Sequence, residues 1–204
     1  MSTPADKTWR EKGQHPIVAI LLFDGVEVLD FAGPYEVFAA ARSETGNPYC
    51  KVFTVASRAD VKCHGGLRVL ADATFDTSPT CDVLVVPGGP GARERNDSQK
   101  PILEFIQQQK NTSEIIASVC TGAFLLARAG LLDGIRATTH SQRLELFAAE
   151  FPGITVENTK LVDEGDVITA GGVACGIDLA LHLLERWLGP EARKREARRL
   201  DGPW

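Results

Sequence analysis

Short runs of β-branched and aliphatic residues alternate along this chain with longer blocks whose apolar positions recur every three or four residues. The short runs indicate buried strands, and the longer blocks indicate helices that turn one face to a core. Strands are predicted at residues 17–23, 52–56, 67–70, 82–86, 115–119, 160–162 and 167–170, the last two forming a hairpin around Glu164-Gly165. This alternation is typical of a layered α/β fold with a mostly parallel central sheet.

Sequence signals mark where several helices begin. Gly33-Pro34 is predicted to open the first helix, which ends at Ala41, because proline is tolerated at an early helical position. Asp97 or Ser98 is a suitable cap for the helix that follows the 82–86 strand. The last strong helix follows Gly171-Gly172 and repeats apolar residues on one face, namely Ile177, Ala180, Leu181, Leu184, Trp187 and Leu188.

The composition is that of a folded globular protein, since 44% of the 204 residues are hydrophobic and 24% are charged. Residues 1–16 are predicted to be a flexible N-terminal extension without a secretory signal, and residues 17–204 a single domain. No apolar run is long enough to span a bilayer, and a net charge of −5 argues against a general nucleic-acid or membrane surface. A charged helix is predicted over 191–200, where basic residues and glutamates together favour a solvated face.

The cysteines are scattered and follow no motif spacing; they are Cys50, Cys63, Cys81, Cys120 and Cys175. An odd number without paired spacing favours a reducing, cytoplasmic setting over a disulfide framework. The Cys63-His64 pair has no second pair at the spacing of a zinc site. No metal and no organic cofactor are therefore expected.

A sharp change of pattern surrounds Cys120. The apolar run 115–119 stops at this cysteine, Thr121-Gly122 follows, and a helix-forming block runs from Ala123 to Ala129. This order resembles a nucleophile elbow, which holds a reactive side chain on a tight turn above a sheet. The N–H groups and dipole at the helix start favour a thiolate, so Cys120 is predicted to ionise more easily than a free cysteine. The alternative is a buried core cysteine.

Two further loops are expected at the same edge of the sheet. Gly88-Gly89 and Gly171-Gly172 each follow a predicted strand, and ligands in open α/β sheets bind beyond the carboxyl ends of the strands. Backbone without side chains can approach a reacting group and offer it N–H donors. For each glycine pair taken alone, a tight connection is the simpler interpretation.

Asp30 lies between the first strand and the first helix and has two interpretations. It is a good N-cap residue. A carboxyl beside a thiolate would instead have its ionisation opposed by the neighbouring charge and by burial, so it could stay protonated and supply a proton in catalysis. Sequence spacing does not decide between the two.

Five segments together resemble the ThiJ/PfpI superfamily, relatives of class I glutamine amidotransferases, from residue 17 to 188. They are LLFDGVEVLDFAGPYEVF, DVLVVPGGPG, SVCTGAFLLARAGLLDG, ATTH and TAGGVACGIDLALHLLE. The resemblance implies a flavodoxin-like three-layer α/β sandwich that is usually a homodimer. It also implies that Cys120 is the elbow nucleophile and that the acid at the first strand–helix junction, here Asp30, hydrogen-bonds it.

Details of the motifs distinguish branches of the superfamily. Peptidase-like members have histidine after the cysteine, where this chain has Thr121, and deglycase- and glyoxalase-like members carry glutamate where it has Asp30. Aspartate with Cys-Thr-Gly is similar to isonitrile hydratases. That resemblance implies that Thr121 orients the reacting groups and that backbone at Gly89, Gly171 and Val173 lines or serves the pocket. His140 matches a histidine found near the cysteine, whereas 141–143 departs from a Trp-containing stretch of the hydratases.

Three functions follow as hypotheses. The first is a cysteine-dependent hydro-lyase that adds water to a small-molecule isonitrile and gives an N-substituted formamide through a thioimidate on Cys120. The second is a ligand- or redox-sensing domain, because the Cys-Thr-Gly-Ala-Phe-Leu-Leu-Ala run resembles the N-terminal halves of AraC-type regulators. The third is amidase or glyoxalase-like chemistry on carbonyl substrates.

Overall fold

The middle layer of the fold is a seven-stranded sheet in the order β10-β11-β7-β6-β1-β2-β5. The computed structural model describes residues 15–204, and the residues 1–14 of the predicted extension lie outside the described part. The strands are β1 (Ile17–Leu22), β2 (Lys51–Ala56), β5 (Ala73–Thr74), β6 (Val83–Val86), β7 (Ile115–Val119), β10 (Leu161–Asp163) and β11 (Val167–Ala170). Every neighbouring pair is parallel except the β10–β11 hairpin. The predicted sheet and hairpin are confirmed.

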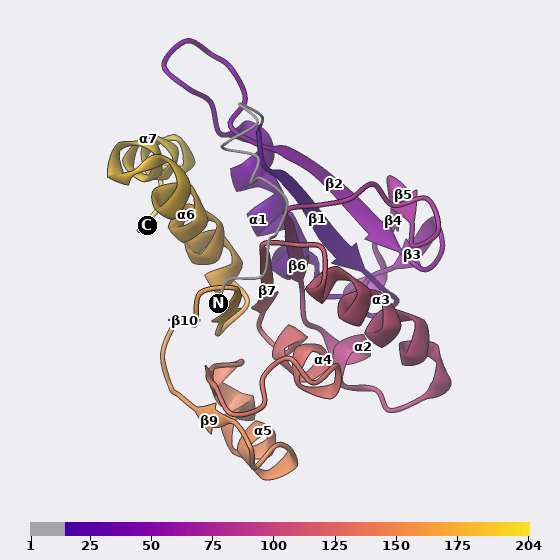
Figure 1. The fold of residues 1–204 in the computed structure, drawn as a ribbon. Helices are drawn as coiled ribbons and strands as arrows, with labels where there is room; N and C mark the ends of the chain where they lie inside the picture. The colour runs from indigo at the N-terminus through magenta and orange to yellow at the C-terminus, as the bar shows by residue number, and fades with distance from the viewer. Residues whose placement is uncertain (1–14) are drawn as a thin grey trace.

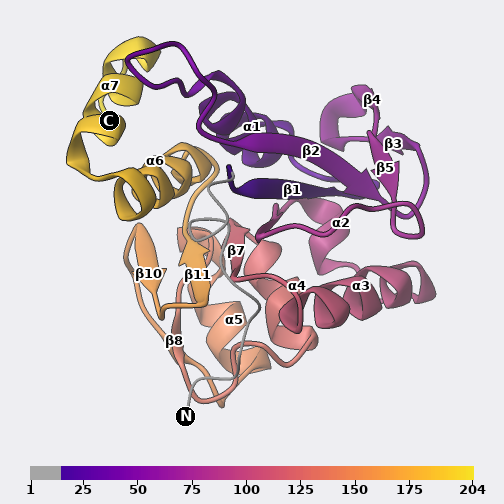
Figure 2. The same ribbon diagram turned by 45° about the horizontal axis from the view of Figure 1, so that its top comes forward.

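Helices cover both faces of this sheet (Figures 1 and 2). One face carries α1 (Val28–Ala40) and α6 (Cys175–Leu188), with α7 (Pro190–Leu200) packed against α6. The other carries α3 (Lys100–Lys110) and α4 (Gly122–Arg128), with α2 (Pro90–Arg93) and α5 (Leu144–Glu150) nearby. The central strands β6 and β7 are wholly buried, since helices cover them on both sides. The predicted flavodoxin-like three-layer sandwich is confirmed.

Short strands form two small sheets outside the main one, and among them the apolar pattern predicts only the run 67–70. The antiparallel pair is β3 (Asp60–Lys62) with β4 (Arg68–Leu70), and the parallel pair is β8 (Arg136–Ala137) with β9 (Thr155–Val156). Three 3-10 turns, η1 (His64–Gly66), η2 (Asp97–Gln99) and η3 (Ser141–Arg143), lie in the connections. The run predicted at 67–70 therefore belongs to a small sheet.

The first helix begins earlier than predicted. It starts at Val28, which places Gly33-Pro34 inside α1. The pair serves helix packing instead: a Cβ at Gly176 of α6 would lie 2.9 Å from Pro34 Cδ, and a Cβ at Gly33 would lie 3.0 Å from Ile177 Cγ1. Small residues at this crossing let α1 and α6 approach closely, so the prediction that Gly33-Pro34 opens the helix is wrong.

The capping residue before α3 also differs from the prediction. Asn96, not Asp97 or Ser98, supplies the side-chain oxygen, which accepts a hydrogen bond from the Ser98 N–H at 3.2 Å. This cap belongs to η2, and α3 follows from Lys100 without a side-chain cap of its own. An intervening 3-10 turn moves the cap toward the N-terminus.

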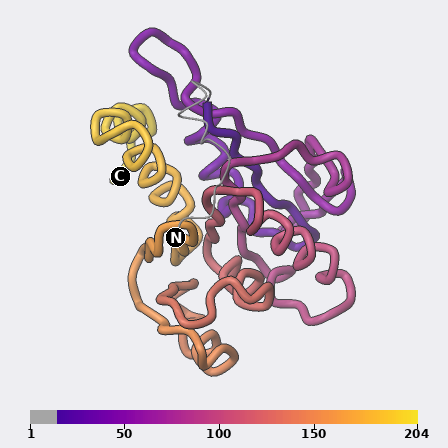
Figure 3. Tube along the Cα trace, in the orientation of Figure 1, coloured from indigo at the N-terminus to yellow at the C-terminus, as the bar shows by residue number. Residues whose placement is uncertain are grey.

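The charged helix α7 forms ion pairs with its own chain. The segment 41–50 between α1 and β2 projects at one end of the molecule (Figure 3), and Arg195 of α7 contacts it through Glu44 at 2.8 Å and the Tyr49 hydroxyl at 2.8 Å. Arg199 pairs with Glu36 of α1 at 2.9 Å. Part of the basic charge is therefore used within the fold. Among residues 15–204, none of the helices has the length and apolar character needed to cross a membrane.

Candidate active site

Cys120 follows β7 in a left-handed backbone conformation, with φ of +56°. A non-glycine residue in this region costs on the order of 1 kcal/mol and is often held there at functional sites. Two neighbours fix it: the Cys120 N–H donates to the Ala170 carbonyl at 2.9 Å, and the Thr139 hydroxyl donates to the Cys120 carbonyl at 2.8 Å. The chain then turns directly into α4. This is the strand–turn–helix geometry predicted for a nucleophile elbow.

Gly122 allows the elbow to pack against the neighbouring strand. A Cβ at this position would lie 2.1 Å from the Val86 carbonyl oxygen at the end of β6. The three nearest atoms are backbone atoms of Val86 and Pro87, so no flexible group could move away. The tight turn therefore requires glycine.

We expect Gly122→Ala to lower the free energy of unfolding by about 3 kcal/mol, because the added methyl group overpacks the backbone at the end of β6. Urea unfolding of the purified variant measures the loss. Gly172→Ala is the matched control, since a Cβ there would meet no atom within 4 Å. Equal stability of the two variants would contradict this account of the elbow.

Asp30 lies in the first turn of α1 with no solvent exposure. Its Oδ2 accepts a hydrogen bond from the Gly88 N–H at 2.9 Å, and its carboxyl lies close enough to the Cys120 thiol for each group to influence the pKa of the other. The N-cap position of α1 belongs to Glu27. The N-cap interpretation of Asp30 is therefore wrong, because its side chain points to the β6 loop and the elbow.

Thr121 joins the elbow to the same loop. Gly89 N–H donates to Thr121 Oγ1 at 2.9 Å, and the Thr121 hydroxyl lies 3.2 Å from the Gly89 carbonyl to which it donates. A Cβ at Gly88 would lie 2.5 Å from the Thr121 nitrogen and 2.9 Å from Asp30 Oδ2. Both glycine amides that were expected to serve a reacting group are thus engaged by side chains of the site.

The environment of the elbow raises the pKa values of both Asp30 and Cys120. Burial raises the pKa of Asp30 from 3.8 to about 7, and the nearby charge of Glu27 adds to the rise. Burial, followed by the Asp30 charge, raises the pKa of Cys120 to about 12. The expectation of an easily ionised thiol is wrong here, because desolvation and a neighbouring carboxylate outweigh the helix start.

The two groups share their protons as a pair. A charge on either one opposes ionisation of the other, so at neutral pH the pair carries at most one negative charge. A thiolate at Cys120 therefore requires a protonated Asp30. In that form the nucleophile and the acid would lie together in one buried place, and the role of Asp30 as a proton donor stays a prediction.

The raised pKa of Asp30 predicts a pH-dependent stability. Below pH 4, near the pKa of the unfolded chain, Asp30 is protonated in both states and costs the folded state nothing. As the pH rises through 7, the folded state must bury a carboxylate and loses free energy of unfolding. Asp30→Asn removes this loss. We expect its free energy of unfolding relative to wild type to rise between pH 4 and 7 by about 4 kcal/mol at most. Urea titrations of both proteins at pH 5, 6, 7 and 8 measure the difference, and a pH-independent difference would contradict the assignment.

A cleft of about 350 Å³ opens above Cys120. Five of the predicted site residues line it, namely Gly89, Cys120, Thr121, His140 and Val173. Asp30 lies beneath as a buried residue. Gly171 does not line the cleft, because its N–H donates to the Lys160 carbonyl at 2.9 Å and α6 begins only at Cys175. The prediction that the Gly171 amide faces a ligand is wrong.

Six lining residues were not predicted, and they are Glu27, His64, Pro90, Arg93, Gln142 and Arg143. Five of them lie within about four residues of a predicted site residue, which is the one signal that could have found them, whereas His64 is far in sequence from all predicted site residues. His140 accepts a hydrogen bond from the Gln142 N–H on Nδ1 at 3.2 Å, so Nε2 is the ring nitrogen left to meet a ligand. Within residues 15–204, no group of three or more His, Cys, Asp or Glu side chains is placed to hold a metal ion.

Comparisons with known proteins agree with this geometry. Residues 17–186 match the DJ-1/PfpI family. An isonitrile hydratase of Pseudomonas putida is 36% identical over 173 residues, which cover 84% of this chain and 72% of that protein. The HTH-type transcriptional regulator GbdR of Pseudomonas aeruginosa is 29% identical over 175 residues, which cover 85% of this chain and 47% of the regulator.

A solved structure shows the same fold. A ThiJ/PfpI family protein from Pseudomonas syringae superimposes with a TM-score of 0.78 at 26% identity, over 93% of this chain and 78% of that one. The relatives include both an enzyme and transcriptional regulators, so the family alone does not decide the activity. Because the family match runs from β1 into α6 and contains the whole elbow, the chain belongs to the DJ-1/PfpI family.

Proposed function

We propose that this protein is an isonitrile hydratase-like enzyme that converts R–N≡C and water into the formamide R–NH–CHO. The observation that carries the proposal is the pairing of Cys120 with a fully buried Asp30 whose pKa lies at about 7. The terminal carbon of an isonitrile must receive a nucleophile and a proton together, and this pair supplies both. The relationship to an isonitrile hydratase supports the same chemistry.

The first step uses the pair in its singly charged form, with thiolate on Cys120 and a proton on Asp30. A bond forms between Sγ and the terminal carbon of the isonitrile, and the same carbon takes the Asp30 proton. The product is the thioimidate R–N=CH–S–Cys120, and Asp30 is left as a carboxylate. The negative charge moves from sulfur to carboxylate, so the site keeps a constant net charge.

Water completes the reaction. Asp30 takes a proton from water as the oxygen bonds to the thioimidate carbon, and it passes that proton to the nitrogen, giving R–NH–CH(OH)–S–Cys120. The C–S bond then breaks with its electron pair returning to sulfur, and Asp30 takes the hydroxyl proton. Formamide leaves, and the thiolate with protonated Asp30 is restored.

Other residues of the cleft assist. The Thr121 hydroxyl ties the Gly88-Gly89 loop, which contacts Asp30, to the elbow. Nε2 of His140 is free to hydrogen-bond a substrate. The cleft and the relationship to an isonitrile hydratase support a small-molecule substrate. The homodimer and the cytoplasmic location stay predictions.

A sensory role is the second candidate. The identity to GbdR, of which this chain spans 47%, favours a ligand- or redox-sensing domain. Such a domain would bind a small molecule in the cleft above Cys120 without turnover. Carbonyl chemistry of the amidase or glyoxalase kind uses the same cysteine and is the third.

Turnover by the purified wild-type protein distinguishes these functions. Formamide is measured with an aryl isonitrile, in parallel with loss of methylglyoxal and of a simple amide, while a thiol assay verifies that Cys120 is reduced. We expect turnover of the isonitrile alone and a mass increase on Cys120 equal to one isonitrile molecule when the reaction is quenched. Faster use of methylglyoxal or amide, or no turnover of any substrate, would refute the proposal.

A further inference from the structure

We infer that the substrate carries a carboxylate, which Arg93 and Arg143 hold at the walls of the cleft above Cys120. This inference names the substrate class of the proposed function and rests on it for the reaction itself. Binding of an anion beside Cys120 can be tested separately. The nucleophile would act at one end of the substrate while the two guanidinium groups fix the other.

Both arginines are half-buried and line the same cleft as Cys120. Neither forms an ion pair with any residue from 15 to 204. Nearby arginines behave differently: Arg95 and Arg128 both pair with Glu150, at 2.6 Å and 3.4 Å. Arginine fits a carboxylate through two parallel N–H···O bonds, so two guanidinium groups without a described partner in one cleft favour such a ligand.

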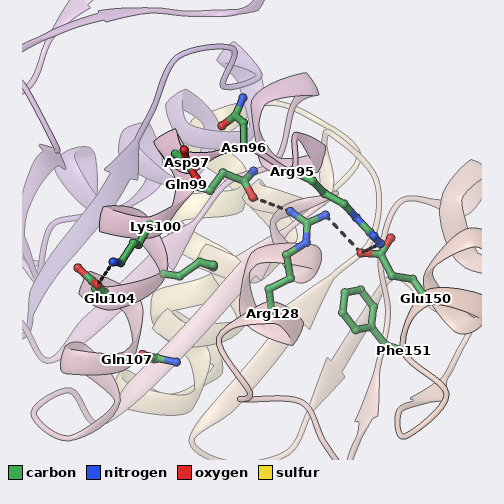
Figure 4. Close-up of a pocket in the computed structure, with 11 residues that line it drawn as sticks. Arg95, Asn96, Asp97, Gln99, Lys100, Glu104, Gln107, Arg128, Glu150 and Phe151 are labelled. Atoms are coloured by element: carbon green, nitrogen blue, oxygen red, sulfur yellow. Dashed lines mark hydrogen bonds and ion pairs between the residues drawn. The ribbon is translucent and has the colours of Figure 1, made fainter.

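The backbone that carries Arg93 is held by Arg128 and Gln99, which are hydrogen-bonded to each other (Figure 4). Arg128 donates to the Ala92 carbonyl at 3.0 Å and to the Glu94 carbonyl at 3.1 Å, on either side of Arg93. Gln99 accepts from Arg128 at 2.7 Å and donates to the Gly91 carbonyl at 2.6 Å. The carbonyls of Gly91, Ala92 and Glu94 are thus fixed on both sides of Arg93. The backbone at Arg93 is therefore rigid, so less conformational entropy is lost when its side chain binds a ligand.

A tight turn places Arg143 beside His140. The Arg143 N–H donates to the His140 carbonyl at 2.7 Å, and the Gln142 N–H donates to the His140 ring. The turn η3 therefore presents an imidazole and a guanidinium to one cleft.

The charges on the cleft walls favour an anion. Two positive charges, on Arg93 and Arg143, line the cleft with the single carboxylate of Glu27. The Cys120–Asp30 pair at its base adds at most one negative charge. Glu27 forms no ion pair with either arginine among residues 15–204, so both guanidinium groups are left for a ligand. A charge in a narrow cleft acts in a lower dielectric than a surface charge does.

The first experiment compares isocyanoacetate with its methyl ester, which has the same reacting group and no charge. We expect the wild type to favour the acid, with a ratio of kcat/KM for acid over ester that falls about tenfold to a hundredfold in Arg143→Gln and in Arg93→Gln. Arg198→Gln is the matched control, because Arg198 is an exposed residue of α7 outside the cleft. An unchanged ratio in both cleft variants would overturn the inference.

The second experiment needs no turnover. Cys120 is alkylated with iodoacetate and with iodoacetamide, which differ in charge and little in size, and the modified peptide is quantified by mass spectrometry. We expect the rate ratio of iodoacetate to iodoacetamide to fall about tenfold when Arg143 or Arg93 becomes glutamine and to stay constant in Arg198→Gln. Equal ratios in all four proteins would overturn anion binding.

The two experiments separate the two proposals. A wild type that hydrates the ester as fast as the acid, with equal alkylation ratios, leaves the proposed reaction intact and refutes the carboxylate. A wild type that hydrates neither compound but shows the arginine-dependent alkylation ratio refutes the reaction and supports an anion site.

Discussion

Cys120→Ala is expected to reduce formamide formation from an isonitrile by at least about a thousandfold in kcat/KM. The variant retains the cleft and the buried acid but has no atom that can bond to the terminal carbon. Its alanine also fits the space of the thiol, which is 5% exposed, so the fold should be kept. Initial rates of formamide production by chromatography measure the loss.

Cys175→Ala controls for general effects of removing a thiol. Cys175 is half-buried at the start of α6 and does not line the cleft, so its removal should change kcat/KM by less than about twofold. Turnover by Cys120→Ala near the wild-type rate would show that the elbow cysteine is not the nucleophile. Circular dichroism of both variants verifies that they are folded.

Asp30→Asn is expected to lose about a hundredfold to ten-thousandfold in turnover while its thiol becomes more reactive. The amide can still accept the Gly88 N–H, but it cannot deliver or take a proton. At the same time the variant removes a negative charge that raises the pKa of Cys120. We expect alkylation of Cys120 by iodoacetamide at pH 8 to be about tenfold faster or more than in the wild type.

The opposite signs of the two effects distinguish catalysis from damage. A distorted site would slow turnover and alkylation of Cys120 together. Alternatively, it would leave the pH dependence of the alkylation rate unchanged. The alkylation rate from pH 6 to 11 shows the pH at which thiol ionisation sets in, which should be lower in Asp30→Asn than in the wild type. A thiol pKa that rises in the variant would contradict the proton-sharing pair.

Much of the scaffold could be predicted from the sequence because it depends on local pattern. The runs at 82–86 and 115–119 are buried on both faces, so continuous apolar residues mark them without ambiguity. The elbow is equally local, since strand, Cys120 and glycine are adjacent. The short strands β8 and β9 have two residues each, too few for any periodicity to be visible.

The features that were mispredicted depend on contacts between distant segments. Asp30 meets Gly88 across 58 residues, and the spacing alone is equally consistent with an N-cap. The helix start near Cys120 is local and suggests a low thiol pKa, whereas the burial and the carboxylate that raise it come from the tertiary fold. Arg93 and Arg143 look like ordinary surface arginines until α2 and η3 are brought to one cleft.

The division of the site between the sheet edge and the surrounding loops has a consequence for how this protein can change. Gly88 and Gly122 lie where backbone segments interlock, so a side chain at either position disturbs the fold. Arg143 lies on a short surface turn that no strand depends on. Selection, or an engineer, can therefore exchange residues 141–143 and change which compounds the cleft accepts, while Cys120 and Asp30 are inherited unchanged.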